Sequence, residues 1–300
     1  MKKKIAIIAN PTAGRGKAEK LAFALQVYLE NQGIEVLIHN TSYRGDAERI
    51  AKETVIEDVS SIVACGGDGT VHEVINGIKA GNSYCAEPDL AILPAGRCNN
   101  FFNALGIPRN LSLIAKALLH KSVKKVALGK IGSRYFATVA TMGFDSAVAE
   151  YVDRGGPPGF LKGTSGYLYG LIATLPRFQF PCVRLTGDFG SIDGYVLLVA
   201  AGNTNSYGGN FIIAPGATPF NGSLSVCVIR KISKFEVIKV LPKVFSGQHI
   251  NHPRVSINTT KNLTIESRKP SWIWADGEKI SSTPVTITIE AETISITFKN

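Results

Sequence analysis

The sequence of 300 residues has few cysteines and no long hydrophobic run. Its five cysteines are odd in number, scattered, and lack the spacing of metal ligands. We therefore expect a reducing, cytoplasmic environment. No apolar run approaches the roughly 20 residues that a membrane-spanning helix needs. The apolar run that follows the basic N-terminus covers only Ile5–Ala9, so we expect a first β-strand there rather than a signal peptide.

Acidic residues are absent between Leu90 and Gly143, although the chain has a net charge of +10. Such a basic stretch can attract nucleic acid, nucleotide phosphates or an anionic membrane surface, or it can be an ordinary solvated face. The sequence has no nucleic-acid-binding motif, and aromatic residues do not alternate with these lysines. We therefore expect no nucleic-acid partner. The basic residues of the stretch are Arg97, Arg109, Lys116, Lys121, Lys124, Lys125, Lys130 and Arg134.

Two common nucleotide-binding motifs are also missing. The pair Gly16-Lys17 lacks both the earlier glycine and the following Ser or Thr of a P-loop, and the glycine cluster at 66–69 contains no lysine. Gly14-Arg15-Gly16 does not complete a dinucleotide fingerprint. These absences argue against an ordinary P-loop ATPase or a dehydrogenase.

A glycine cluster after a short apolar run is the most informative stretch that is present. Ile62–Cys65 is predicted to be a buried strand, and the glycines that follow allow a sharp turn. Thr70 and Glu73 have the spacing of a capping box, so a helix is predicted to begin at Thr70. A helix N-terminus binds phosphate readily, and Mg²⁺ would let the carboxylate of Asp68 lie near that phosphate. The alternative is a glycine turn with a solvated aspartate.

Strands and helices alternate in the first part of the chain. Ile5–Ala9 and Ile34–Ile38 are predicted strands, and a helix is predicted over Lys17–Glu30. The alternation indicates an α/β N-terminal domain with a mainly parallel sheet, whose ligands bind at the carboxyl ends of the strands. The loops at Asn10, Thr41, Asp68 and Gly96 all follow predicted strands and could therefore converge on one crevice.

Short β-rich segments dominate from about residue 123, which predicts a second, mainly antiparallel β-sandwich domain. We place the nucleotide-binding domain at residues 1–124 and the β-rich domain at 125–289. Near the C-terminus, Trp272–Glu278 contains the pair Asp276-Gly277, a strong hairpin signal.

Three segments together resemble the diacylglycerol kinase and sphingosine kinase family of lipid kinases, in particular its soluble bacterial members. They are Gly66–Thr70 (GGDGT), Asn10–Gly14 (NPTAG), and Leu93–Phe101 (LPAGRCNNF) with the following Ala104–Pro108. The first segment also occurs in NAD kinases, whereas the other two favour the lipid kinases. The strand-end loops and the resemblance together give these nucleotide-binding candidates: Asn10, Pro11, Thr12, Ala13, Gly14, Thr41, Gly66, Gly67, Asp68, Gly69, Thr70, Val71, His72, Glu73, Gly96 and Arg97.

The resemblance implies an ATP- and Mg²⁺-dependent lipid kinase that works at an anionic membrane surface, peripheral to the inner face. It implies that Asp276 or Glu278 is the catalytic base, because an Asp-Gly-Glu segment supplies the acidic residues at the family's transfer site. It implies that Asp68 serves the nucleotide's Mg²⁺. It also implies a lipid cleft in the second domain and the return of the last strand, within residues 290–300, to the first domain.

Several positions depart from the family pattern. Arg97 replaces a threonine, and Asn100 and Ala127 stand where aspartates are usual. A segment that resembles a regulatory Mg²⁺ loop carries Asn221 in place of its aspartate. These changes keep two alternatives open: a catalytically weak nucleotide- or lipid-binding protein and, third, an NAD kinase. The sequence does not name the lipid, since diacylglycerol, a sphingoid base and phosphatidylglycerol all present a hydroxyl.

Overall fold

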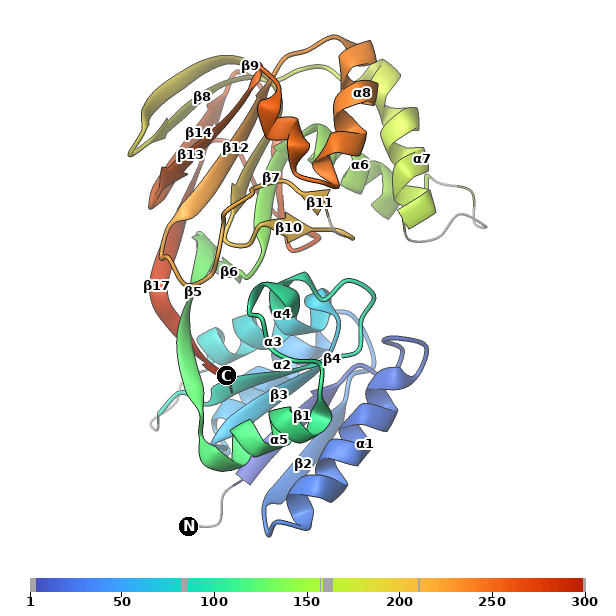
Figure 1. Cartoon of the computed structure of the whole chain (residues 1–300), viewed down its shortest axis with the longest axis vertical. Helices are drawn as coiled ribbons and strands as arrows, with labels where there is room; N and C mark the ends of the chain where they lie inside the picture. The colour runs from blue at the N-terminus through green and yellow to red at the C-terminus, as the bar shows by residue number, and fades with distance from the viewer. Residues whose placement is uncertain (1–3, 82–85, 157, 159–163, 210, 299–300) are drawn as a thin grey trace. The chain divides into compact units, whose positions relative to one another are not determined.

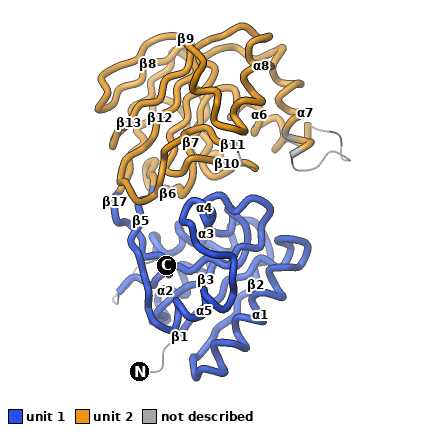
Figure 2. The backbone as a smooth tube through the Cα atoms, in the orientation of Figure 1, with its two compact units in different colours: residues 1–128, 291–300 blue, residues 129–290 orange. Residues whose placement is uncertain are grey.

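The computed structural model describes residues 4–81, 86–156, 158, 164–209 and 211–298. The chain forms two compact units, which Figure 2 shows in different colours. Unit 1 comprises residues 1–128 and 291–300, and unit 2 comprises residues 129–290. The division at 128/129 falls inside a strand, β5 (Val123–Ile131), which also contains the predicted boundary at 124/125. The chain therefore passes between the units along β5 and β17 (Val285–Thr297) rather than through a linker.

Unit 1 has a parallel sheet in the order β17-β4-β3-β1-β2, which confirms the predicted α/β architecture. Helix α1 packs with α5, and α2 packs with α3; Figure 1 shows the sheet between these two pairs. The elements are β1 (Lys4–Ala9), α1 (Lys17–Glu30), β2 (Glu35–Asn40), α2 (Asp46–Val55), β3 (Ser61–Gly66), α3 (Asp68–Ala80), β4 (Asp89–Pro94), α4 (Asn100–Ala104) and α5 (Leu111–His120).

Residue spacing explains the packing of unit 1. Helix α1 has the predicted bounds, and its buried residues Ala18, Ala22, Leu25 and Leu29 recur every three or four positions on one face. Strand β3 is buried along its whole length, as is usual for a strand with helices on both faces.

Unit 2 is mainly antiparallel, as predicted, with helices α6, α7 and α8 gathered on one side of it (Figure 1). Its strands are β5, β6 (Arg134–Phe136), β7 (Val139–Gly143), β8 (Cys182–Gly187), β9 (Gly190–Gly202), β10 (Ser206–Tyr207), β11 (Phe211–Ile212), β12 (Leu224–Arg230), β13 (Val255–Thr260), β14 (Asn262–Ser267), β15 (Trp272–Ala275), β16 (Glu278–Ser282) and β17. Its helices are α6 (Phe144–Asp153), α7 (Thr164–Thr174) and α8 (Lys234–Val244), with 3₁₀ turns at Leu175–Arg177 and Gln248–Asn251.

Strand β9 separates two hydrophobic cores of unit 2. Val199 and Ala201 belong to a core enclosed by strands, whereas Leu198 and Ala200 belong to a core that includes residues of α6, α7 and α8. Because successive side chains of a strand point to opposite faces, one strand can contribute to both cores. The second core holds the helices against the sheet.

Candidate functional site

Three loops that follow strands of unit 1 are joined by backbone hydrogen bonds. The N–H of Asn10 donates to the carbonyl of Cys65 at 2.9 Å. The N–H groups of Ala95 and Gly96 both donate to the carbonyl of Gly66, at 2.9 and 3.0 Å. The loops after β1, β3 and β4 therefore meet at one edge of the sheet, at the carboxyl ends of its strands.

Glycines allow these loops to approach one another closely. A Cβ atom at Gly96 would lie 2.4 Å from the Cα of Gly67, and one at Gly14 would lie 2.3 Å from the carbonyl oxygen of Ala95. Gly14 also has a φ of +61°, which side chains other than glycine rarely adopt. Any larger residue at these two positions would push the loops apart.

The first loop is held by a turn of its own. The side-chain Oδ1 of Asn10 accepts hydrogen bonds from the N–H of Thr12 at 3.1 Å and from its hydroxyl at 2.8 Å. This arrangement is an Asx turn, in which the side chain imitates a backbone carbonyl. Asn10 therefore shapes the segment Asn10–Gly14, while Thr12 and Gly14 stay exposed.

Helix α3 begins at Asp68, two residues before the predicted start, and its N-cap is Gly67. The predicted capping box of Thr70 and Glu73 is wrong, because no side chain of the described residues caps this helix. Its first-turn N–H groups point along the axis and carry the positive end of the helix dipole, as an anion-binding helix start does. The side chains of Val71 and His72 are buried, so only their backbone could contribute to a ligand site.

Glu73 binds the start of a different helix. Its carboxylate accepts hydrogen bonds from the N–H groups of Gly45 at 2.9 Å and Ala47 at 3.1 Å, at the N-terminus of α2. Thr41 lies in the loop before α2, and its N–H donates to the carbonyl of Ala9 at 2.9 Å. Glu73 thus fixes the loop that contains Thr41. The capping-box spacing was present in the sequence, but a partner 28 residues away takes the carboxylate.

The carboxylate of Asp68 lies at the start of helix α4. It accepts hydrogen bonds from the N–H of Asn100 at 3.0 Å, from the Nδ2 of the same residue at 3.2 Å, and from the N–H of Phe101 at 3.2 Å. A carboxylate at a helix N-terminus stabilises the helix. Asp68 therefore positions the loop that follows β4, in addition to any role towards a metal ion.

The side chain of Asn100 contributes one of the three hydrogen bonds to Asp68. It is buried, and its amide donates a hydrogen bond where an aspartate at this position would place a second negative charge. Its Oδ1 is buried without a hydrogen-bond partner among the described residues. An amide oxygen of this kind can accept from water or bind a cation.

The other residues that depart from the family pattern lie at three separate places in the structure. Arg97 is exposed in the loop after β4, and Ala127 is buried in β5. Asn221 is exposed in a turn, where its N–H donates to the carbonyl of Thr218 at 3.3 Å. In the described part of the chain, no three His, Cys, Asp or Glu side chains cluster as metal ligands.

In unit 2, Asp276 and Gly277 form the turn between β15 and β16, with φ values of 52° and 85°. The carboxylate of Asp276 accepts hydrogen bonds from the N–H of Ala137 at 2.7 Å and from the N–H and hydroxyl of Thr138 at 2.8 and 2.5 Å. Asp276 therefore holds the segment that enters β7. Glu278 opens β16 after the turn, so the two acidic residues are not alternate positions of one strand.

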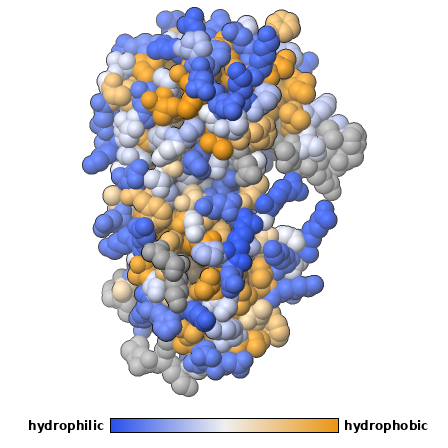
Figure 3. All heavy atoms as spheres, in the orientation of Figure 1, coloured by the Kyte–Doolittle hydropathy of each residue, from blue (hydrophilic) through white to orange (hydrophobic). Residues whose placement is uncertain are grey.

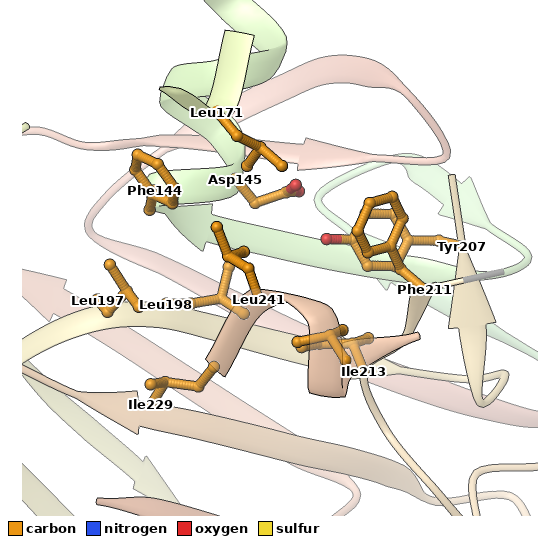
Figure 4. A pocket seen from close by; sticks show the side chains of 11 residues that line it. Phe144, Asp145, Leu171, Leu197, Leu198, Tyr207, Phe211, Ile213, Ile229 and Leu241 are labelled. Carbon is orange, nitrogen blue, oxygen red and sulfur yellow. The ribbon is translucent and has the colours of Figure 1, made fainter. Parts of the chain in front are cut away.

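An apolar cavity of about 40 Å³ lies in unit 2 beneath α7 and α8. Leu171 of α7 and Leu241 of α8 line it together with residues of β9 and β12. Asp145 and Tyr207 bring polar atoms to its wall, and Figure 4 shows their oxygens turned towards each other. The carboxyl group of Asp145 also accepts a hydrogen bond from the hydroxyl of Thr141 at 2.9 Å. Sequence reasoning missed both polar residues, because their pairing joins segments 62 positions apart.

Burial raises the pKa of Asp145 from 3.8 to about 6, although hydrogen bonds from Tyr207 and Thr141 oppose the shift. The folded state therefore binds a proton more tightly than the unfolded state, and this carboxyl group costs stability as the pH rises from about 4 to about 6. We expect the free energy of unfolding of the wild type, relative to Asp145→Asn, to fall over this range by on the order of 3 kcal/mol. Urea titrations of both proteins at several pH values measure it. A constant difference between the two proteins would contradict the prediction.

Comparison with known proteins gives a family match for each of the two units. Residues 4–131 match the family described as diacylglycerol kinase catalytic domain, and residues 138–298 match the YegS C-terminal NAD kinase beta sandwich-like domain. The chain is 30% identical over 278 residues to a diacylglycerol kinase of Staphylococcus carnosus, covering 93% of this chain and 89% of the relative. It is also 30% identical over 282 residues to a diacylglycerol kinase of Bacillus subtilis, covering 92% and 90%.

The fold is similar to that of a solved structure. A crystal structure of a Bacillus anthracis protein, provisionally named a diacylglycerol kinase, matches with a TM-score of 0.79 at 25% identity. The match covers 99% of this chain and 95% of the other.

Proposed function

The chain belongs to the diacylglycerol kinase family, and on that premise we propose that it transfers the γ-phosphate of ATP to the hydroxyl of a diacylglycerol-like lipid. It is a lipid kinase, and so a phosphotransferase with an alcohol group as acceptor. The observation that carries the proposal is the meeting of three glycine-bearing loops beside the start of α3, where no described side chain caps the helix.

Unit 1 supplies the phosphate-binding groups in this proposal. The N–H groups at the start of α3 bind the phosphates, the loops of Asn10–Gly14 and Gly96 lie beside them, and exposed Arg97 adds positive charge. Phosphoryl transfer needs mainly positioning and electrostatic stabilisation, which such groups provide. In unit 2, Asp276 or Glu278 accepts the proton of the lipid hydroxyl.

The residues present fit a magnesium ion that arrives with the nucleotide. Asp68 offers a carboxylate, and the buried Oδ1 of Asn100 offers a neutral oxygen that no described residue uses. Mg²⁺ commonly takes one or two protein oxygens and keeps phosphate and water for the rest. When bound, the ion would neutralise charge on the phosphates. We do not assign it to Asn221, whose exposed turn has no acidic cluster among the described residues.

We propose that the cavity beneath α7 and α8 receives part of an acyl chain. Its lining is almost wholly aliphatic and aromatic, which suits a hydrocarbon chain. A void of about 40 Å³ has room for only a few water molecules. Entry of a chain therefore requires α7 or α8 to move outward. We place the lipid itself in an anionic membrane surface, to which the protein binds peripherally from the cytoplasmic side. No helix of the described residues is long and apolar enough to cross a membrane.

A second candidate function is a nucleotide- or lipid-binding protein with weak catalysis. The observation that favours it is the amide of Asn100 beside Asp68, where the family pattern has a second carboxylate. An NAD kinase ranks third, supported by the segment Gly66–Thr70, which also occurs in NAD kinases, and by the name of the family that matches residues 138–298.

A panel of acceptors separates these functions. Incubation with ATP labelled at the γ-phosphate should label diacylglycerol and leave NAD unlabelled. Sphingosine and phosphatidylglycerol belong in the same panel. Labelled NAD with unlabelled lipids would contradict the lipid-kinase assignment, and no labelled product despite tight ATP binding would favour the binding protein.

A further inference from the structure

Helix α8 has two apolar faces, and only one of them is buried. Val237, Val240 and Val244 are buried and belong to the core beneath the helices. A second set follows the same three- and four-residue spacing on the exposed side: Phe235, Ile238, Pro242 and Phe245. Residues at this spacing form one stripe along a helix. At the end of the stripe, the ring of Phe245 packs against that of Phe211, with 4.3 Å between their centroids, whereas Phe235 and Ile238 stay largely exposed.

The exposure of this stripe is unusually high for such large apolar side chains. Phe235 is 81% exposed and Ile238 is 59% exposed. Neighbouring α7 also exposes Leu168 and Ile172, at 53% and 67%, and its sequence contains no charged residue. In Figure 3, hydrophobic residues reach the surface in the region where Figure 1 places α8. Contiguous exposed apolar side chains of this kind mark a surface that binds a partner or a membrane.

Charged residues of α8 indicate which partner this surface fits. Lys239 and Lys243 are exposed beside the stripe, and Lys234 precedes it. Glu236 is the only acidic residue of α8, every residue of which is described, and it is held at the helix start. Its Oε2 accepts a hydrogen bond from the N–H of Ser233 at 2.9 Å, while the hydroxyl oxygen of Ser233 accepts from the N–H of Glu236 at 3.2 Å.

We infer that α8 lies in the surface of an anionic phospholipid bilayer, with Phe235 and Ile238 inserted among the acyl chains. An exposed apolar stripe flanked by lysines is the pattern of helices that lie in the membrane interface. The lysines would contact anionic headgroups, because long basic side chains keep their charge in the polar layer while their stems cover apolar surface.

The position of α8 connects this surface with the cavity. Leu241 and Val244 on its inner side line the cavity, as does Leu171 of α7. The same two helices thus separate the cavity from the proposed membrane surface, and Lys234 links them through a hydrogen bond from its Nζ to the carbonyl of Pro176, directly after α7. Binding of α8 to the membrane would place the cavity's cover against the lipid. This part of the inference rests on the proposed lipid-kinase function.

Cosedimentation of the whole protein with vesicles tests the inference. The vesicles contain either phosphatidylglycerol with phosphatidylcholine, or phosphatidylcholine alone. We expect the double variant Phe235→Ser/Ile238→Ser to bind the anionic vesicles about tenfold or more weakly than wild type. The control Phe23→Ser, which removes a 64% exposed phenylalanine of α1 in unit 1, should bind as wild type does. Undiminished binding of the double variant would overturn the inference.

Charge variants make the test specific for α8. Lys239→Ala/Lys243→Ala should weaken binding to anionic vesicles and leave binding to neutral vesicles unchanged. The matched pair Lys116→Ala/Lys121→Ala removes two exposed lysines of the acid-free stretch in unit 1. If only this unit 1 pair weakened binding, the basic stretch would be the membrane surface and α8 would not.

Two further measurements keep the outcome clear. Phosphorylation of a water-soluble short-chain diacylglycerol should be equal in wild type and the Phe235/Ile238 variant, which shows that the variant is folded. If no protein phosphorylated any lipid but vesicle binding still depended on Phe235, the proposed function would fail while the membrane surface would stand. A wild-type dimer that the double variant dissociates in sedimentation equilibrium would instead make α8 a contact between two copies, and would overturn the inference.

Discussion

Replacing the catalytic base by its amide should lower phosphoryl transfer by roughly 10²- to 10⁴-fold, which is the usual contribution of a positioned proton acceptor. We expect this loss in Asp276→Asn, in Glu278→Gln, or in both. The affinity for ATP should stay unchanged, because we assign nucleotide binding to unit 1. Steady-state rates at saturating lipid and equilibrium ATP binding measure the two effects separately.

The contacts of Asp276 require a structural control. Its carboxylate accepts three hydrogen bonds from Ala137 and Thr138, and an amide cannot accept all of them. Asp276→Asn should therefore also lower the free energy of unfolding, by about 1–3 kcal/mol. Thr138→Val removes the hydroxyl contact and keeps the carboxylate, so it measures the structural part alone.

The comparison between these variants identifies the base. A rate loss in Asp276→Asn that far exceeds the loss in Thr138→Val assigns the base to Asp276. A rate loss in Glu278→Gln at unchanged stability assigns it to Glu278. Wild-type rates in both amide variants would remove the 276–278 turn from the mechanism.

Local patterns predicted much of the fold. Helix α1 has the predicted bounds because its apolar residues recur at helical spacing and glycines flank it. The hairpin at Asp276-Gly277 follows from two residues that readily adopt positive φ. The loops of unit 1 meet as predicted because parallel strands end at the same edge of the sheet.

Predictions failed where a distant residue decides the local structure. Glu73 has the spacing of a capping box, yet it binds the start of α2, so α3 begins at Asp68 without a side-chain cap. Helix α8 was missed although Ser233 and Glu236 form a real capping box at its start. Its second apolar stripe and Pro242 obscure the one-sided pattern from which a helix is usually recognised.

The contacts of Asp68 change what its substitution should do. A carboxylate that only met a metal ion could become an amide without cost to the fold. The carboxylate of Asp68, however, accepts three hydrogen bonds at the start of α4. In Asp68→Asn, the new amide group must face at least one buried N–H of Asn100 or Phe101. An unpaired buried donor costs about 1–3 kcal/mol, so the variant should unfold at lower denaturant concentration.

We also expect Asp68→Asn to weaken Mg²⁺-dependent ATP binding by about tenfold or more. The reason is that the variant loses one unit of negative charge near the ion, in surroundings with an effective dielectric constant of about 20. Isothermal titration with ATP, in Mg²⁺ and in EDTA, measures this effect. The control is Asp46→Asn, because the carboxylate of Asp46 likewise accepts a backbone hydrogen bond in unit 1, from the N–H of Ser42 at 2.8 Å, but Asp46 is not one of the nucleotide-binding candidates.

The two variants separate a role in the fold from a role towards the ligand. If Asp68 acts on the metal-bound nucleotide, its variant loses affinity mainly in Mg²⁺, whereas Asp46→Asn loses stability and keeps its affinity. Equal loss of affinity in Mg²⁺ and in EDTA would mean that Asp68 acts by holding α4 and the loop of Gly96 in place. Wild-type affinity under both conditions would show that neither role matters for nucleotide binding, and the carboxylate would then be a cap for α4 alone.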